Sequence, residues 1–173
     1  MILKGGKVVL RPLEVEDAQT IVSLINDAEF RQYLTLAFPI NKFMEEDWIK
    51  KHSSSSNEVN LAITADGELI GTTGYDIDWV NRWAEFGIGI FNKKFWGKGY
   101  GTEATKLMLK YAFHRLNLNR VYLRVLEYNE RAIRVYEKCG FVLEGRQRQA
   151  AFWDGKYHDI LMMSILAEEY FKS

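Results

Sequence analysis

The chain has 173 residues, and its 23 lysine and arginine residues balance its 23 aspartate and glutamate residues. A formal net charge of +0 and a pI near 6.8 give no general attraction to polyanions, so we expect neither nucleic acid nor an anionic membrane as a partner. The length predicts a single domain spanning residues 1–173, with enough chain for a substantial core.

The first part of the sequence alternates between strand and helix patterns. A strand is predicted at residues 7–11, and an amphipathic helix begins at 14–17. The mixed polar and aromatic segment 26–40 then leads into a short helix at 45–52. The serine run 53–56 is expected to be an exposed connection, because a strand pattern resumes a few residues later.

A three-stranded meander is predicted next. Strands at 59–64 and 68–75 flank Asp66-Gly67, and Asp-Gly is a strong signal for a hairpin turn. A third strand, at 83–91, completes the meander and leads into a glycine-rich segment.

The segment 95–104 places Gly97, Gly99 and Gly101 directly before a helical pattern. Glycines can adopt positive φ and bring backbone N–H donors together, and a helix N-terminus adds further donors and positive partial charge. The segment therefore predicts a phosphate site, with a glycine-rich turn that binds nothing as the alternative. It does not match a P-loop, because Gly99 follows Lys98, nor a dinucleotide fingerprint, because Thr102 stands where glycine is required.

The rest of the chain predicts two helices and three strands. In chain order they occupy 102–116, 120–125, 130–138, 142–152 and 156–166. Asn129 suits the N-cap of the second helix, and Gly140 suits the position just past its end. Asp154-Gly155 is a second hairpin signal between the last two strands.

The start of the chain and its cysteine content predict a cytoplasmic protein. Residues 1–6 lack the long apolar stretch of a secretory signal, and no run approaches the roughly 20 apolar residues of a membrane-spanning helix. The single cysteine, Cys139, shares no metal-ligand spacing with His52, His114 or His158. We expect a buried packing role for Cys139 and no metal.

The chain resembles the GNAT superfamily of N-acetyltransferases from about Lys7 to Leu166, most specifically in residues 82–86, 95–104 and 129–141. The family's loop pattern is Arg or Gln, two residues, Gly, one residue, then Gly or Ala. Gly99 and Gly101 satisfy it, whereas Trp96 stands at the Arg or Gln position. Within the family the chain is most similar to the branch that includes ribosomal-protein N-terminal acetyltransferases and spermidine acetyltransferases.

The resemblance implies an α/β (α+β) GNAT fold. Its central sheet would be mixed and largely antiparallel, with about six or seven strands and about four flanking helices. The sheet would be splayed at an acetyl-CoA cleft, where the pantetheine arm pairs with the strand and the glycine segment holds the pyrophosphate. The implied cofactor-binding residues are Ile88, Gly89, Ile90, Trp96, Gly97, Lys98, Gly99, Tyr100, Gly101, Thr102 and Asn129.

The sequence bears on two of these assignments independently of the resemblance. Gly87 and Gly89 lie inside a strand, where glycine permits close approach of a ligand, although a β-bulge is the alternative. Asn129 could contact the cofactor, cap its helix, or do both.

The resemblance also implies the chemistry. Tyr136 aligns with the family's general acid toward the departing CoA thiolate, and a backbone N–H near Ile88 could donate to the thioester carbonyl. Glu85 is a candidate base for the incoming ammonium, with structural pairing to Arg82 as the alternative.

The acceptor is expected to be a primary amine that enters between residues 26–40 and the final hairpin, with Glu29 and Tyr33 as its binding residues. Glu45 and Glu46 could bind a cation there too, but solvated positions are expected for both. Branch resemblance favours a protein N-terminal α-amine. The alternatives are a polyamine or aminoglycoside-like small molecule, or a non-catalytic acyl-CoA sensor. The aromatic content of 14% leaves a homodimer open.

Overall fold

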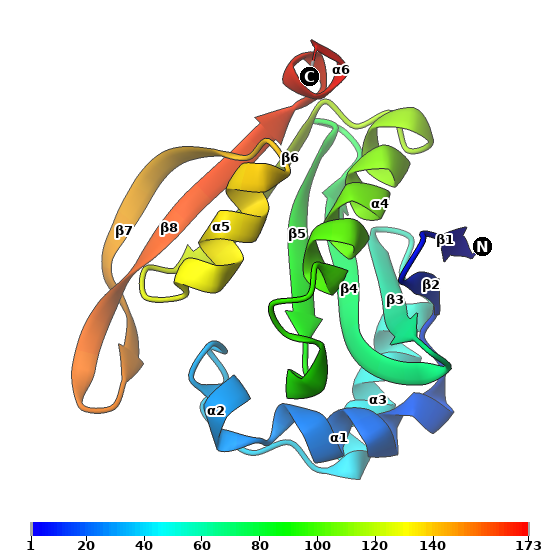
Figure 1. The fold of residues 1–173 in the computed structure, drawn as a ribbon, viewed down its shortest axis with the longest axis vertical. Helices are drawn as coiled ribbons and strands as arrows, with labels where there is room; N and C mark the ends of the chain where they lie inside the picture. The colour runs from blue at the N-terminus through cyan, green and yellow to red at the C-terminus, as the bar shows by residue number, and fades with distance from the viewer. Residues whose placement is uncertain (1, 173) are drawn as a thin grey trace.

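The computed structural model describes residues 2–172, and within them the chain forms one eight-stranded sheet with helices on both faces (Figure 1). The strands are β1 (Leu3–Lys4), β2 (Val9–Pro12), β3 (Glu58–Ala65), β4 (Glu68–Asp78), β5 (Trp83–Ile90), β6 (Arg120–Leu126), β7 (Val142–Trp153) and β8 (Lys156–Leu166). The α-helices are α1 (Ala18–Ile25), α2 (Ala28–Arg31), α3 (Lys42–Ser53), α4 (Tyr100–His114), α5 (Glu130–Lys138) and α6 (Ala167–Lys172). Short 3₁₀ turns, η1 (Val15–Asp17) and η2 (Lys93–Phe95), precede α1 and the glycine segment.

The sheet runs in the order β1-β2-β3-β4-β5-β6-β8-β7, and every neighbouring pair is antiparallel except β5 and β6. Both predicted hairpin turns have positive φ at two successive residues, at Asp66-Gly67 (53° and 80°) and at Asp154-Gly155 (48° and 75°). Such turns match the right-handed twist of the strands that they join. The β7–β8 hairpin curves away from the other strands, beside α5 (Figure 1).

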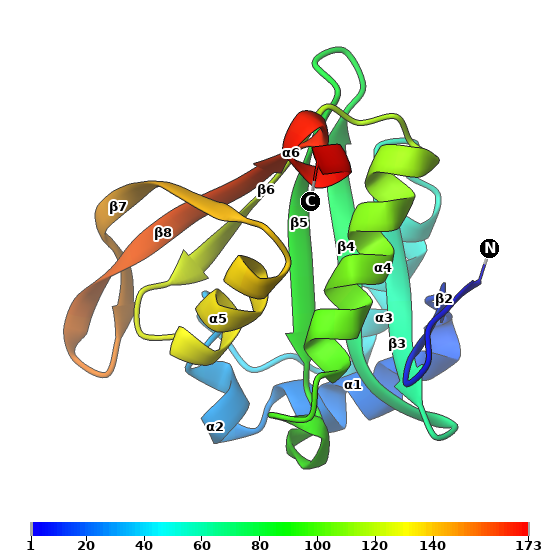
Figure 2. The ribbon, with the colours of Figure 1, turned by 45° about the horizontal axis from the view of Figure 1, so that its top comes forward.

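Two hydrophobic clusters fill the two sides of the sheet. Because successive strand residues point to opposite faces, Leu61 and Ile63 pack in the cluster that holds the apolar face of α4, whereas Ala62 packs with α1 and α3. Figure 2 shows α4 and α5 on the near side of the sheet and α3 behind it. None of the helices in residues 2–172 has the length and apolar character needed to cross a membrane.

The expected fold class is confirmed, but the described chain has more elements than the six or seven strands and four helices predicted. The unpredicted β1, α2 and α6 contain only two, four and six residues. Elements this short cannot develop a full hydrophobic period. Local bonds define α2 instead, since the Asp27 side chain accepts from the backbone N–H groups of Glu29 and Phe30.

Candidate active site

The site begins where β5 and β6 part. In these parallel strands, residues Trp83–Glu85 of β5 pair with Arg120–Tyr122 of β6. The rest of β5 has no partner on that side (Figure 2). Tyr33 and Tyr128 pack against each other (6.3 Å between ring centroids), and the Tyr128 hydroxyl donates to the Gln32 carbonyl. The segment after α2 is thereby held beside the gap.

Alternation along β5 determines which backbone groups face this gap. The Phe91 N–H donates to the Ile70 carbonyl (2.8 Å), and the Gly87 carbonyl accepts from the Thr73 hydroxyl (2.9 Å), so odd-numbered residues of β5 bond toward β4. Ile88 and Ile90 therefore turn their N–H and C=O groups away from β4. They present polar groups where a pantetheine arm would pair.

The glycines of β5 are explained by this arrangement. β4 and β5 stay in register from Gly71–Ile90 to Asp78–Trp83, so the bulge alternative is wrong. A Cβ on Gly87 would meet nothing within 4 Å, whereas a Cβ on Gly89 would lie 2.5 Å from the Phe91 ring and 3.2 Å from the Phe30 ring. Gly89 is thus required by aromatic packing, and Gly87 faces open space.

The glycine segment links β5 to α4 through two left-handed residues, Gly97 (φ 70°) and Gly99 (φ 86°), and Gly99 is the N-cap of α4. Gly101 lies inside the helix and has no positive φ, contrary to the sequence-based expectation for all three glycines. A Cβ at Gly101 would lie 3.7 Å from the Ile90 side chain, an ordinary van der Waals contact, so packing does not require glycine there.

A first cavity of about 430 Å³ lies between this segment and α5. It is lined by three cations, Arg131, Arg134 and Lys138, and by no carboxylate. From the other wall come Ile88, Gly89, Ile90, Trp96, Gly97, Gly99, Tyr100, Gly101 and Thr102, all predicted from the sequence. Lys98 is the exception, because it does not line the cavity and its carbonyl accepts from the Lys7 ammonium (2.9 Å). A cationic cavity with unpaired strand groups and glycine-loop N–H donors fits acetyl-CoA.

A second cavity, of about 250 Å³, continues the first along β6. The two cavities share Tyr33, Leu34, Ile88, Asn129 and Tyr136 in their walls. The second adds one carboxylate, Glu85, and one cation, Arg124. A thioester entering from the first cavity and an amine entering from the second would meet at the shared residues.

Tyr136 stands at this junction. Its side chain is 7% exposed, and burial raises its pKa well above the usual value of a phenol. No hydrogen bond engages its hydroxyl among residues 2–172. The phenol is therefore protonated at neutral pH and available to a ligand.

Asn129 performs the capping role and keeps a free donor. Its side-chain oxygen accepts from the Ala132 N–H (3.3 Å), which caps α5. The side chain lines both cavities, and its amide NH₂ has no partner in the described part of the chain. The two roles considered from the sequence are thus compatible.

Both carboxylate oxygens of Glu85 have partners. Oε1 accepts from Arg124 Nε (2.7 Å) and Oε2 accepts from the Tyr122 hydroxyl (3.1 Å). The sequence-based alternative of a structural ion pair is correct in kind, but the partner is Arg124 from β6 rather than Arg82. Glu85 nevertheless lines the second cavity.

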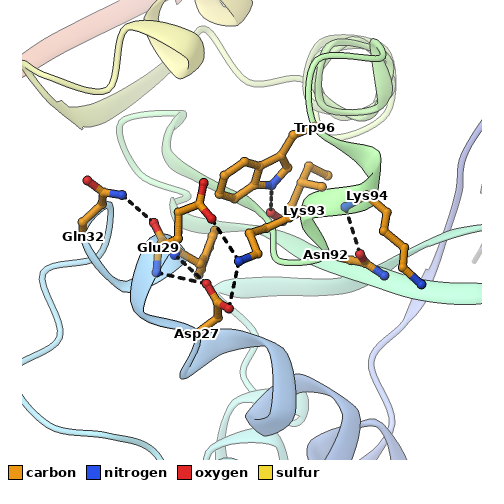
Figure 3. A network of polar contacts seen from close by, with 9 residues as sticks. Asp27, Glu29, Gln32, Asn92, Lys93, Lys94 and Trp96 are labelled. Atoms are coloured by element: carbon orange, nitrogen blue, oxygen red, sulfur yellow. Dashed lines mark hydrogen bonds and ion pairs between the residues drawn. The ribbon is translucent and has the colours of Figure 1, made fainter.

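Of the two residues expected to bind the acceptor, only one lies at the site. Tyr33 lines both cavities, whereas Glu29 lines neither and pairs with the Lys93 ammonium (2.9 Å), which also contacts Asp27 (3.1 Å; Figure 3). Glu45 is buried rather than solvated, and burial raises its pKa.

Cys139 is half-buried, and burial raises the pKa of its thiol to about 11, as suits a packing role. Within residues 2–172 no group of three or more His, Cys, Asp and Glu side chains is arranged to hold a metal ion. The absence of a metal stays a prediction.

Several residues that line the two cavities were not predicted from the sequence. Ala132 could have been found, since it follows Asn129 by three residues and precedes Tyr136 by four, which places all three on one face of a helix. Arg131 lies on the same helix but carried no pattern that singled it out, whereas Arg124 and Phe30 are brought to the site by other elements.

A splayed sheet with a glycine loop at the end of the freed strand defines an acetyltransferase class. A family model described as an acetyltransferase (GNAT) domain matches residues 7–142, and the chain belongs to this family. It is an acetyl-CoA-dependent N-acetyltransferase.

Among its relatives is a spermidine N(1)-acetyltransferase of Escherichia coli, 38% identical over 94% of this chain and 88% of the relative. A putative ribosomal N-acetyltransferase of Bacillus subtilis, YdaF, is 33% identical over 94% and 93%. The spermidine N-acetyltransferase of Vibrio cholerae, solved in complex with CoA and spermine, superimposes with a TM-score of 0.89 at 31% identity, covering 96% of this chain and 99% of that one.

Proposed function

We propose that this enzyme acetylates a primary amine of a small molecule, with linear polyamines as the leading class. The observation that carries the proposal is the second cavity, a space of about 250 Å³ that meets the first at Tyr136 and contains a carboxylate. Its size suits an aliphatic amine, and Glu85 offers the amine a carboxylate although Arg124 already pairs with it. The spermidine acetyltransferases among the relatives support the same choice, so the sequence-based preference for a protein N-terminus is not favoured.

The donor would be held by backbone groups. Bound acetyl-CoA supplies the acetyl group as an activated thioester. The C=O of Ile88 and the N–H of Ile90 would pair with the pantetheine arm, while the N–H groups of the glycine loop and of the first turn of α4 would bind the pyrophosphate. The Ile90 carbonyl is already taken by the Trp96 indole N–H (2.7 Å; Figure 3).

Glu85 would receive the amine. An aliphatic amine is mostly an ammonium at neutral pH, and it must lose a proton before it can attack the thioester carbonyl. The Glu85 carboxylate can hold the ammonium and take its proton through water, while Arg124 and Tyr122 keep the carboxylate in position. The Ile88 N–H would stabilise the negative charge that develops on the carbonyl oxygen.

Tyr136 would complete the transfer. When the carbon–sulfur bond breaks, the electron pair goes to sulfur, and the neutral phenol can donate a proton or a hydrogen bond to the thiolate. Because Tyr136 is buried, its surroundings favour the neutral phenol over the phenolate.

The test is the release of CoA thiol from acetyl-CoA in the presence of spermidine, aminoglycosides, and peptides with different N-terminal residues. Spermidine and related polyamines should give the highest kcat/KM. Preference for peptides would overturn the small-molecule assignment, and would instead place the enzyme with the relative named as a putative ribosomal acetyltransferase.

A further inference from the structure

Arg131 lines the first cavity, and its guanidinium lies over the rings of two other lining residues, Trp96 and Tyr33. It is the second residue of α5, and its guanidinium carbon lies 3.6 Å from the centroid of the Trp96 ring and 5.4 Å from that of Tyr33. Trp96 belongs to the opposite wall, at the start of the glycine segment. The guanidinium therefore bridges the two walls between which the cofactor must pass.

This cation has no ion-pair partner. Among residues 2–172 its contacts are the two aromatic rings, and the Glu29 carboxylate acts on it only from beyond ion-pair distance. Partial burial lowers the pKa of the guanidinium, although an arginine stays charged at neutral pH. Arg134, one turn further along α5, differs because it pairs with Glu130 (3.2 Å). A partly buried, unpaired guanidinium on a cavity wall is suited to an anion.

Trp96 supports this guanidinium but carries no charge itself. The indole N–H is spent on the Ile90 carbonyl, and the ring packs beside Phe30 (6.4 Å between centroids), so this side chain brings no charge to the start of the loop. The indole face instead supports the guanidinium, because a cation over tryptophan is stabilised by the ring's quadrupole. The positive charge thus comes from α5, across the cavity.

We propose that Arg131, seated on Trp96, is a cofactor-binding residue that supplies a cation to the pyrophosphate of CoA. Its planar guanidinium can donate two parallel hydrogen bonds to phosphate oxygens, opposite the N–H donors of the glycine loop. The assignment does not depend on which amine accepts the acetyl group, and it can be tested by binding alone.

The experiment measures the affinity of the Arg131→Gln variant for three probes by calorimetry: CoA, dephospho-CoA, which keeps the pyrophosphate but lacks the 3′-phosphate, and pantetheine, which lacks both. The variant should bind CoA and dephospho-CoA about tenfold more weakly and pantetheine unchanged. Raising the salt concentration should shrink the deficit, because the lost contact is electrostatic.

Two controls accompany this variant. Arg131→Lys keeps the charge and should recover part of the lost affinity. Arg120→Gln removes an arginine that also lies over an aromatic ring, 5.6 Å from the Tyr122 centroid, but lines neither cavity, so it should leave dephospho-CoA binding within about twofold. Weakening of CoA alone would assign Arg131 to the 3′-phosphate, and equal weakening of all three probes would assign it to the shape of the pantetheine channel. Either result, or no change, overturns the proposal.

Discussion

Tyr136 is the residue in which sequence motif and structure agree most closely. A tyrosine on a helix is ordinarily a packing residue, and this one does pack, with its ring 5.8 Å from that of Phe141. What distinguishes it is a hydroxyl that has no partner among the described residues and lies at the junction of two cavities. Burial raises its pKa, so the phenol stays protonated and can donate a hydrogen bond to the thiolate that forms beside it.

Removing this hydroxyl should separate chemistry from binding. Tyr136→Phe keeps the ring and its packing, so the dissociation constant for CoA should change little, while kcat should fall about a hundredfold. The measurement is steady-state kinetics with the best amine, together with calorimetry of CoA. An unaltered kcat would remove Tyr136 from the reaction.

Glu85 should act on the amine rather than on the cofactor. In Glu85→Gln the amide can keep the contact with Tyr122 but loses the negative charge, so the KM of a polyamine should rise about tenfold while CoA affinity stays the same. Glu144→Gln is the matched control, since Glu144 also pairs with an arginine, Arg120, but lines neither cavity. Equal effects of the two substitutions on KM would show that Glu85 only stabilises the fold.

Among the elements, the β5–α4 loop combines a backbone requirement with a binding role. Gly97 (φ 70°) and Gly155 (φ 75°) have nearly the same left-handed backbone, and at neither would a Cβ meet an atom within 4 Å. An alanine in this conformation costs about 1–2 kcal/mol at either position. The two glycines differ only in place, since Gly97 lines the first cavity and Gly155 forms the distant β7–β8 turn.

Alanine substitutions at Gly97 and Gly155 test whether the β5–α4 loop binds the cofactor. Gly97→Ala and Gly155→Ala should lower the thermal midpoint by similar amounts, but only Gly97→Ala should weaken CoA binding, because strain there shifts the N–H donors of the loop. Thermal unfolding and CoA titration on both variants make the comparison. An unchanged CoA affinity of the Gly97→Ala variant would mean that this loop does not bind the cofactor.

The order of elements could be predicted from the sequence because its signals are local. The start of α5 and the bounds of β8 were predicted to the residue, since Asn129 caps the helix and Asp154-Gly155 immediately precedes the strand. The partners of Glu85 could not be predicted in this way. Arg124 reaches it only because β6 pairs beside β5, which is a property of the sheet and not of either strand.

In the molecule as a whole, the splay of one sheet creates both halves of the site. If β5 and β6 paired along their full length, β6 would occupy the backbone groups of Ile88 and Ile90, and the space around Tyr136 would close. Ending the ladder at Glu85 and Tyr122 leaves a channel with a cationic half and a half that contains a carboxylate. The donor and the acceptor are thereby directed to opposite ends.

The most direct test of this account is a crystal structure of the enzyme with CoA and spermidine. It should show the CoA sulfur within hydrogen-bonding distance of the Tyr136 hydroxyl, the pantetheine arm paired with Ile88 and Ile90, and an amine of spermidine in the cavity beside Glu85. A CoA sulfur remote from Tyr136, or spermidine bound outside that cavity, would contradict the claim that donor and acceptor meet where the two strands part.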